Sequence, residues 1–561
     1  MIKKWKVREA DEIRAKEISE KFDISMLTSN IIANKNLSDE EIEVYLNPVR
    51  SNLHDPFKLP DMRLAVDRII KAINENEKII IYGDYDADGI TSTTVLKRFF
   101  SDRGIEVDTY IPNRLDEGYG LNKNAIEEIA EKGFKLIITV DCGITAIEEV
   151  ELGKKLGIDI IITDHHETLD DLPKAIAVVD AKRKDNKYPF KGLAGCGVAF
   201  KLTQALCKEL DLNENECLKY LDIVTIGTIS DIVPLVDENR VITKLGLKLV
   251  AITKNLGLKA LLEITKYKKI DSTTVSFGIS PRINACGRMG HQEDALNLFL
   301  TNDPIEARKL AKKIEEYNKE RQDIEKNIYN EAKEIIEKDY LDKPSIVIGK
   351  EGWHHGVIGI VSSKITEEYY KPSILVCFEN DEAKGSGRSI PSFDLHEAIT
   401  KCSTYLTNCG GHSMAIGLSL EKKNFEKFKE EFEKYSNEKL IEDQIPEMEI
   451  DEVLTSQDLE LNAVNELNML EPFGEANSEP IVMYKNIKIE SIRTLSEGKH
   501  LKLSLKDDGN ILLDAIGFNM GSLASTYQIG DKIDVAGNIG INSYNNVERV
   551  QIVLRDMRFT V

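Results

Sequence analysis

The segment Lys78-Ile-Ile-Ile-Tyr-Gly-Asp-Tyr-Asp-Ala-Asp-Gly89 joins a short apolar run to three closely spaced aspartates. Such a run is typical of a buried parallel strand, and α/β proteins hold ligands at the carboxyl ends of these strands. Further acids follow apolar or β-branched runs, which we interpret as strands: 136–140 before Asp141, 158–163 before Asp164-His165-His166, and 223–229 before Asp231. This order predicts a parallel sheet with its acids gathered at one edge.

Gathered carboxylates are costly to bury unless a cation neutralises them, and a divalent metal is the usual answer. Oxygen ligands with one or two imidazoles favour Mg²⁺ or Mn²⁺ over a closed zinc site. Two such ions about 4 Å apart clamp the attacking and leaving oxygens of a phosphoryl displacement. The pattern therefore predicts metal-dependent phosphoester hydrolysis with two metal ions in the active site.

Each acid also has a simpler interpretation. A single Asp after a strand is more often a turn former or a helix N-cap than a metal ligand. The Asp84-x-Asp86-x-Asp88 spacing also imitates an EF-hand loop, but Leu96 stands where that loop needs a glutamate. The ordered series of acidic segments, with Asp-His-His among them, favours the metal site.

These motifs resemble those of the DHH phosphoesterase superfamily and, within it, the RecJ family of single-stranded-DNA exonucleases. Segments 84–89, 140–143 and 163–166 look like motifs I to III, and 228–231 looks like motif IV. The resemblance begins near Trp5 and continues to the C-terminus through further matching segments: 111–120, 281–288, 352–359, 385–389, 410–417 and 471–474. The Gly-Gly-His element in 410–417 is similar to that of DHHA1 domains.

The resemblance implies a set of metal ligands, which are Asp86, Asp88, Asp141, His165 and Asp231. It also places two neighbouring side chains in the catalytic site as supporting or phosphate-binding groups, Asp84 and His166. Asp164 is expected to orient a histidine, as carboxylates beside metal ligands often do.

The resemblance also implies substrate contacts. The residues expected to hold a 5′-terminal phosphate are Arg114, Ser386 and Arg388. Those expected to contact the strand or its nucleotide are Asn284, Arg288 and His412. We interpret the glycines beside Ser386 as allowing the backbone to approach a phosphate, which an arginine can bind through two hydrogen bonds.

Simpler roles remain open for several of these side chains. Arg388 could form a surface salt bridge, because exposed arginines are common. The glycines before His412 could simply make a tight turn. His354 and His355, which follow Trp353, could contact DNA or serve in packing and capping.

Composition limits the other possibilities. The 561 residues are too many for one core, and the net charge of −22 argues against nucleic-acid binding over the whole surface. The 8 cysteines include no Cys-x-x-Cys pair, which indicates reduced thiols. No segment resembles a signal peptide or a membrane span, so we expect a cytoplasmic protein without a membrane partner.

The pattern along the chain predicts an α/β protein with a parallel-sheet domain and a second α/β domain joined by a long helix. The resemblance implies that these are a DHH domain and a DHHA1 domain. A C-terminal all-β region with short alternating runs suggests a small barrel, and the resemblance implies that this barrel is an OB-fold. The boundaries that we expect are 1–55 for an N-terminal helical segment, 56–300 for DHH, 301–340 for the helix, 341–440 for DHHA1 and 446–561 for the barrel. Because the chain ends soon after the barrel, we expect the further C-terminal domain of some relatives to be absent.

The barrel carries a possible strand-binding surface, because basic and aromatic side chains interleave in proteins that bind single strands. The basic candidates are Lys485, Lys488, Arg493, Lys499, His500 and Lys502. The aromatic candidates are Tyr484, Phe518 and Tyr544. Exposed lysines and buried aromatics also occur in barrels with no such role.

The function that the resemblance implies is a 5′→3′ exonuclease that degrades single-stranded DNA to 5′-mononucleotides in recombination and repair. Its implied partners are single-stranded DNA, a helicase and a single-strand-binding protein, and we expect a monomer. The alternative is a DHH phosphodiesterase for short oligonucleotides or cyclic dinucleotides, although the extra C-terminal region counts against it. A non-catalytic nucleic-acid-binding relative is disfavoured because all the motif acids are present.

Overall fold

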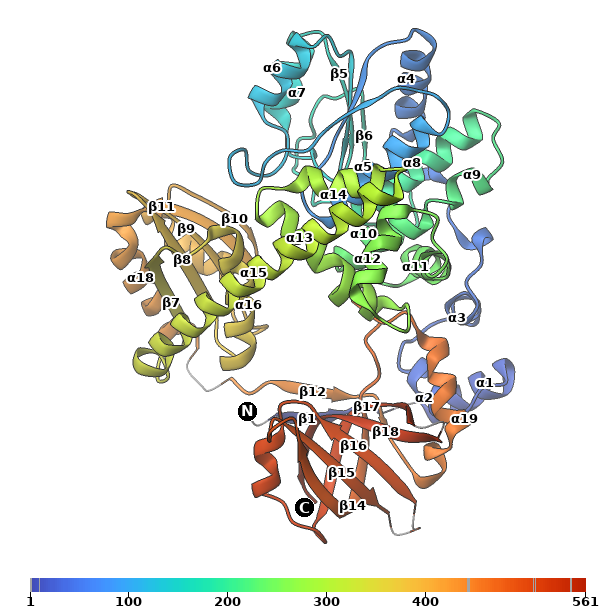
Figure 1. The fold of residues 1–561 in the computed structure, drawn as a ribbon, viewed down its shortest axis with the longest axis vertical. Helices are drawn as coiled ribbons and strands as arrows, with labels where there is room; N and C mark the ends of the chain where they lie inside the picture. The colour runs from blue at the N-terminus through green and yellow to red at the C-terminus, as the bar shows by residue number, and fades with distance from the viewer. Residues whose placement is uncertain are drawn as a thin grey trace. The chain divides into compact units, whose positions relative to one another are not determined.

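The computed structural model describes residues 3–9, 11–440, 444–507, 509, 511–544 and 547–560. The chain forms two compact units. The larger unit comprises His54–Asp231 and Gly246–Ile445, and the barrel unit comprises Met1–Leu53, Ile232–Leu245 and Pro446–Val561. Figure 1 shows the elements of both units. No described helix has the length and apolar character needed to cross a membrane.

The first sheet of the larger unit is parallel throughout, with the strand order β3-β2-β4-β5-β6. Its strands are β2 (Ile79–Tyr82), β3 (Asp108–Tyr110), β4 (Leu136–Val140), β5 (Asp159–Thr163) and β6 (Ala177–Val179). The helices that alternate with these strands or follow them are α4 (Met62–Asn74), α5 (Ala87–Ser101), α6 (Lys123–Glu131), α7 (Ile147–Lys155) and α8 (Gly195–Glu209). The strands predicted before motifs I, II and III are thus confirmed.

The run before Asp231 is not a strand but helix α10 (Leu221–Ser230), so that prediction was wrong. The residues from Leu221 to Ile229 are all buried, and the helix packs against α5 and α8. A helix that is apolar on every side lacks the spacing that distinguishes it from a buried strand. Asp231 therefore follows the end of a helix rather than of a strand.

The rest of this part of the larger unit is helical. Its helices are α9 (Asn215–Leu218), α12 (Leu256–Thr265), the π-helical turn η3 (Thr274–Ile279), α13 (Ser280–Arg288), α14 (Gln292–Leu300) and α15 (Pro304–Asp339). Most of α11 (Asp237–Val250) belongs to the segment Ile232–Leu245 of the barrel unit. The predicted long helix is confirmed by the 36 residues of α15. Asp303 caps it, Pro304 opens it, and it packs against α12, α13, α14 and α16 (His355–Tyr369).

The second sheet of the larger unit has the order β10-β11-β9-β8-β7, and only β7 and β8 are parallel. Its strands are β7 (Ile346–Glu351), β8 (Ser373–Glu379), β9 (Glu382–Arg388), β10 (Asn408–His412) and β11 (Ala415–Glu421). One face packs against α15 and α16, and the other packs against α17 (Leu395–Lys401) and α18 (Phe425–Lys439). The predicted second α/β region is confirmed.

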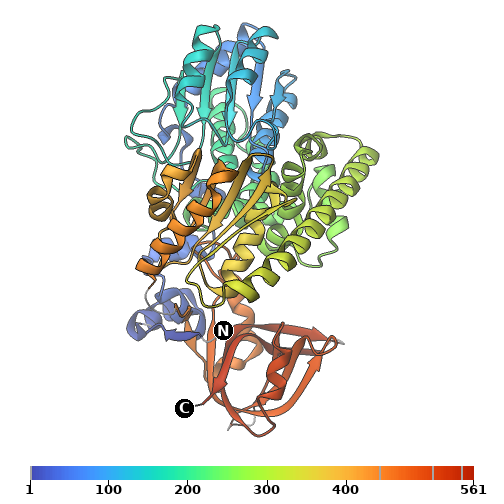
Figure 2. The same ribbon diagram turned by 90° about the vertical axis from the view of Figure 1, so that its left-hand side faces the viewer.

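The barrel unit contains a closed barrel, visible in Figure 2. Its strands are β14 (Val482–Leu495), β15 (His500–Lys506), β16 (Leu512–Gly517), β17 (Lys532–Tyr544) and β18 (Val547–Phe559), and pairing of β14 with β17 closes the ring. The short strand β13 (Glu452–Val453) pairs with β14. The predicted OB-like barrel is confirmed.

The N-terminal segment shares a hydrophobic core with this barrel. It forms β1 (Lys4–Val7), α1 (Glu12–Phe22), α2 (Met26–Ala33) and α3 (Asp39–Leu46), and β1 pairs with β12 (Glu447–Ile450). The predicted helix start at Ser38 is confirmed by a capping box with Glu41. The remaining helix, α19 (Leu461–Glu466), also contributes to this core.

Candidate two-metal centre and phosphate pocket

Motif I turns from strand β2 into helix α5. The side chain of Asp86 caps α5 by accepting hydrogen bonds from the backbone N–H groups of Asp88 and Gly89, at 2.9 and 3.1 Å. The carboxylate of Asp88 accepts two more, from Gly195 N at 2.6 Å and Cys196 N at 2.8 Å. These donors form the first turn of α8, where backbone N–H groups attract negative charge. Asp88 is therefore held by the N-terminus of a helix more than a hundred residues away in the sequence.

The motif side chains gather into overlapping groups of possible ligands, two of which share no residue. Asp84, Asp86 and Asp141 offer atoms that lie within 4.8 Å of one another, and Asp88, His165 and Asp231 form a second such group. A third group, Asp141, His165 and His166, overlaps both. The Nε2 atom of His165 lies 3.1 Å from Asp141 Oδ1 and 3.5 Å from Asp231 Oδ2, so the groups adjoin. All the ligands that the resemblance implied are thus brought together, and Asp84 joins them.

The chemistry of this cluster fits divalent cations. Among the described residues, buried atoms that lack a hydrogen-bond partner include Asp84 Oδ1, Asp141 Oδ1 and both ring nitrogens of His165. Unpaired acceptors are costly to bury, and carboxylates packed this closely repel one another. Burial and the neighbouring acids Asp88 and Asp86 raise the pKa of Asp231 to about 9. Burial lowers the pKa of His165 to about 4, which keeps its imidazole neutral and able to bind a metal.

His166 occupies a different environment from His165. Its Nδ1 lies 2.7 Å from Asp164 Oδ1 and 3.1 Å from the hydroxyl of Tyr119. Burial opposes protonation, but the hydrogen bond and charge of Asp164 prevail and raise the pKa of His166 to about 9. Asp164 is itself fully buried and accepts the backbone N–H of Ile144. The expectation that Asp164 orients a histidine is confirmed.

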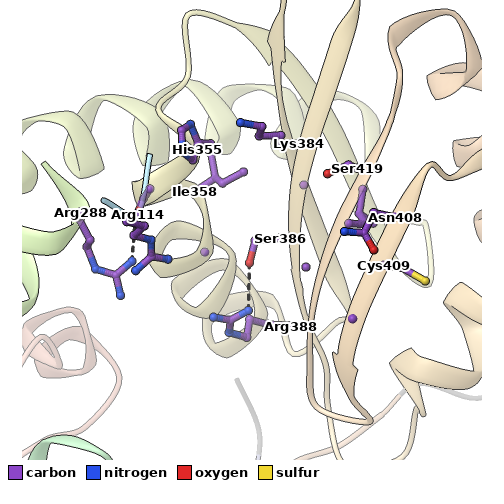
Figure 3. A pocket seen from close by; sticks show the side chains of 16 residues that line it. Arg114, Arg288, His355, Ile358, Lys384, Ser386, Arg388, Asn408, Cys409 and Ser419 are labelled. Carbon is purple, nitrogen blue, oxygen red and sulfur yellow. Dashed lines mark hydrogen bonds between the residues drawn. The ribbon is translucent and has the colours of Figure 1, made fainter. Parts of the chain in front are cut away.

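A cavity of about 430 Å³ lies between α16 and the second sheet (Figure 3). None of its lining residues is acidic, and its charged side chains are Arg114, Arg288, Lys384 and Arg388. Ser386 also lines it, as do His355 and the β10 residues Asn408, Cys409 and Gly410. Because the lining is cationic, this pocket suits an anion such as a phosphate.

The arginines of the pocket are half-buried and poorly neutralised. Arg388 donates from Nη1 to Ser386 Oγ at 3.1 Å and to the carbonyl of Gly387 at 2.7 Å. Arg288 donates to the carbonyl of Gly356 at 2.7 Å, and burial together with the charge of Arg114 lowers its pKa to about 9. Among the described residues no carboxylate forms a salt bridge with Arg388, so the surface salt-bridge interpretation was wrong.

The glycines of β9 have a reason other than the one expected. Along this strand Ser386 and Arg388 line the pocket, whereas the absent Cβ atoms of Gly385 and Gly387 face apolar side chains of the core. A Cβ on Gly385 would lie 2.7 Å from Leu418 Cδ1, so these glycines permit close packing. Inside the pocket it is helix α16 that comes close to strand β9, because Gly359 of α16 has no side chain. A Cβ on Gly359 would lie 2.9 Å from Ser386 Oγ.

Two implied substrate residues lie elsewhere. Asn284 accepts the backbone N–H of Ala87 at 2.9 Å, so its side chain holds the start of α5 beside motif I. His412 is exposed on β10 and does not line the pocket, although the same strand contributes Asn408. His354 caps α16 by accepting the N–H of Gly356, whereas His355 lines the pocket. The side chain of Tyr544 lies outside the part of the chain that the structure describes.

Several groups of the candidate site were not predicted from the sequence. They are the backbone N–H groups of Gly195 and Cys196, the Tyr119 hydroxyl, and the pocket residues Lys384 and Asn408. The glycines in Gly192-Leu-Ala-Gly-Cys-Gly197 were the one available signal for a backbone site. Lys384 also stands two residues from Ser386, on the same face of a strand.

The cluster of acidic side chains should make the stability of the metal-free protein depend on pH. Burial and mutual repulsion raise the pKa values of Asp84, Asp88, Asp141 and Asp231, so the folded state keeps protons that the unfolded chain releases near pH 4. Stability therefore falls as pH rises through this window, up to about 9 for Asp231. We expect Mn²⁺ to raise the melting temperature by several degrees more at about pH 8.5 than at about pH 6.5.

Thermal melts in chelator and in Mn²⁺ at both pH values measure this difference. Asp67→Asn, an exposed change on α4, is the matched control and should leave the difference intact. A stabilisation by Mn²⁺ that is the same at both pH values would contradict the proposed competition between protons and metal.

Three protein-family models match three separate parts of the chain, which correspond to its first α/β region, its second α/β region and its barrel. Residues 78–228 match the DHH family N-terminal domain, 342–438 match the DHHA1 domain and 450–556 match the RecJ OB domain. The single-stranded-DNA-specific exonuclease RecJ of Bacillus subtilis is 39% identical over 560 residues, which are 99% of this chain and 70% of that protein. This chain belongs to the RecJ family. The RecJ of Escherichia coli is 32% identical over 521 residues, with 89% of this chain and 90% of that protein covered.

Solved RecJ structures share the fold. The structure of Thermus thermophilus RecJ in complex with Mn²⁺ gives a TM-score of 0.87 at 30% identity and covers 100% of this chain and 80% of that one. The same protein in complex with Mg²⁺ gives 0.81 at 29% identity, with 100% and 79% covered. The resemblance drawn from the motifs is therefore confirmed at the level of the RecJ family.

Proposed function

We propose that this protein is a metal-dependent 5′→3′ exonuclease that hydrolyses single-stranded DNA to 5′-mononucleotides in recombination and repair. The observation that carries the proposal is that one unit holds both a two-group cluster of metal ligands and a cationic pocket. The RecJ relatives, which are named single-stranded-DNA-specific exonucleases, support it.

We assign Mn²⁺ or Mg²⁺ to the cluster, in keeping with the metals of the two Thermus RecJ structures. Asp84, Asp86 and Asp141 would hold one ion, and Asp88, His165 and Asp231 the other. When bound, two such ions supply a hydroxide at neutral pH and neutralise the charge that develops on the phosphate.

The remaining side chains of the site would bind the DNA strand and orient it. Arg114, Ser386 and Arg388 would hold the terminal 5′-phosphate, and Arg288 would hold the next part of the strand. His166, kept protonated by Asp164, is placed to hydrogen-bond a phosphate oxygen. Asn284 acts through the start of α5, and His412 remains our candidate for a nucleotide contact.

The barrel unit favours the exonuclease over the alternative of a phosphodiesterase for short oligonucleotides or cyclic dinucleotides. An OB barrel is a common binding surface for single strands, and a small substrate would not need one. Single-stranded DNA is thus the proposed partner, with a helicase and a single-strand-binding protein as suppliers of that strand. We also propose the five domain boundaries expected from the sequence, a monomeric state and a cytoplasmic location.

The test is a product assay on oligonucleotides labelled at either end, single- and double-stranded, with Mn²⁺, Mg²⁺ or chelator. We expect a 5′ label to appear at once as a mononucleotide, and a 3′-labelled strand to shorten step by step. Activity should require metal and a single-stranded 5′ end. Early release of the 3′ label would reverse the assigned direction, and cleavage of only dinucleotides or cyclic dinucleotides would favour the alternative.

A further inference from the structure

Two residues with exposed aromatic side chains lie in neighbouring segments of the larger unit, one just after α12 and one in the π-helical turn η3 that packs against α12. Phe277 is 71% exposed and Tyr267 is 42% exposed. A Cβ on Gly278 would lie 2.9 Å from Tyr267 Cε2, so the Tyr267 ring packs over the backbone beside Phe277. Exposed rings of this size are unusual on a well-packed helical region, and π-helical turns are frequent at functional sites.

The surroundings of these rings are basic, although the whole chain is acidic. Tyr267 lies in the exposed run Lys266-Tyr-Lys-Lys269. Lys269 pairs with Asp271 at 3.8 Å, whereas in the described chain no carboxylate lies within salt-bridge distance of Lys266 or Lys268. Alternating cations and exposed rings suit a ligand with a negative backbone and flat faces, which is single-stranded nucleic acid.

Helix α13 relates these rings to the phosphate pocket and the metal ligands. At its C-terminal end Arg288 lines the pocket, and in its middle Asn284 holds the start of motif I. At its N-terminal end Ser280 lies 2.5 Å, Oγ to Oγ, from Ser230, the residue before Asp231. The turn η3 immediately precedes Ser280 and packs against α10. The nine-residue helix spans eight steps of about 1.5 Å, so the pocket end and the η3 end lie roughly 12 Å apart.

We propose that Tyr267 and Phe277 form an aromatic platform on which bases stack on the 3′ side of the scissile bond, while Lys266 and Lys268 contact the adjoining phosphates. The platform rests on the proposed exonuclease function: a strand whose 5′-phosphate is held by Arg388, and whose next part is held by Arg288, would continue past the metal ligands along α13 toward the rings. Stacking needs no particular base, so the platform would advance any sequence.

The first test pairs each ring with the base that it would hold. We expect Phe277→Ala to raise KM about tenfold on long 5′-phosphorylated strands with kcat unchanged, since stacking of a base on an aromatic ring strengthens binding of the strand. In the wild type, a single abasic site moved along the strand should raise KM by the same factor at one or two adjacent positions. Phe277→Ala should add nothing further on those abasic strands, and Phe277→Trp should restore KM.

Matched controls separate the platform from a structural role. Ile305→Ala removes an equally exposed apolar side chain at the start of α15 and should leave KM unchanged on every substrate. If Phe277→Ala were as harmful on abasic strands as on intact ones, Phe277 would serve packing and the platform would be wrong. No change of KM on intact strands would overturn it as well.

The contacts of the two lysines with phosphates are tested by measuring how DNA affinity depends on salt concentration. We expect Lys266→Ala and Lys268→Ala each to reduce the slope of log affinity against log salt concentration by about 0.7, for every sequence alike. An unchanged slope would remove the phosphate contacts from the proposal. If the wild type shortened strands from the 5′ end but neither lysine nor ring variants differed from it, only the platform would fail. If the wild type shortened no strand, the exonuclease function itself would fail.

Discussion

Asp141→Asn is expected to lower the rate of strand hydrolysis by at least about 10³-fold while leaving the fold intact. Asp141 is buried, its Oδ1 lacks a hydrogen-bond partner, and it borders both ligand groups through His165. Its loss removes negative charge where two metal ions must sit, and the loss of one preorganised electrostatic contact already costs about 10²–10³-fold in rate.

The same variant should not be destabilised without metal, which separates a ligand from a structural residue. Burial and Asp88 raise the pKa of Asp141, so its carboxylate adds repulsion to the empty cluster. Asparagine keeps the shape that the tight contact with Gly195 requires and removes that repulsion. We expect a melting temperature in chelator equal to or above that of the wild type, and little gain on adding Mn²⁺.

The measurements are turnover at saturating Mn²⁺ and thermal melts with and without metal. Asp67→Asn on the exposed face of α4 is the matched control and should behave as the wild type in both. Near-normal turnover of Asp141→Asn with an undiminished Mn²⁺ response would show that the metals are held by other residues.

Arg388→Ala is expected to impair cleavage of 5′-phosphorylated strands by about 30- to 150-fold, and to affect 5′-hydroxyl strands little. A guanidinium that is half-buried, as Arg388 is, and binds a phosphate through two charge-assisted hydrogen bonds contributes about 2–3 kcal/mol. Arg388 is part of a pocket without acids, and no strand that ends in a hydroxyl can make this contact. The ratio of kcat/KM for the two ends is therefore the quantity to measure.

Two further variants sharpen the test. Arg388→Lys keeps the charge but loses the two-pronged geometry, so it should recover part of the preference for a 5′-phosphate. Arg308→Ala, an exposed arginine on α15, should leave the preference unchanged. Equal losses on both substrates would mean that Arg388 binds an internal phosphate or maintains the fold, and the 5′ anchor would then lie elsewhere.

The sequence alone was sufficient to predict those elements and motifs that produce a recognisable pattern in consecutive residues. The strands before Asp84, Asp141 and Asp164 are short apolar runs that end in polar loops, and a parallel sheet brings such ends to one edge. The long helix α15 shows the three- and four-residue spacing of a helix with one buried face. The RecJ family and the ligand types followed from motifs of the same kind.

Three other features were decided by the tertiary structure, because no pattern in consecutive residues encodes them. The run before Asp231 is a helix because it is buried on every side, and full burial erases the spacing that distinguishes helix from strand. The donors to Asp88 are backbone N–H groups, which any residue except proline possesses, so their identity leaves no mark in the sequence. The cationic pocket combines Arg114, Arg288 and Arg388 from three distant segments, and only packing of the chain brings three mutually repelling cations around one cavity.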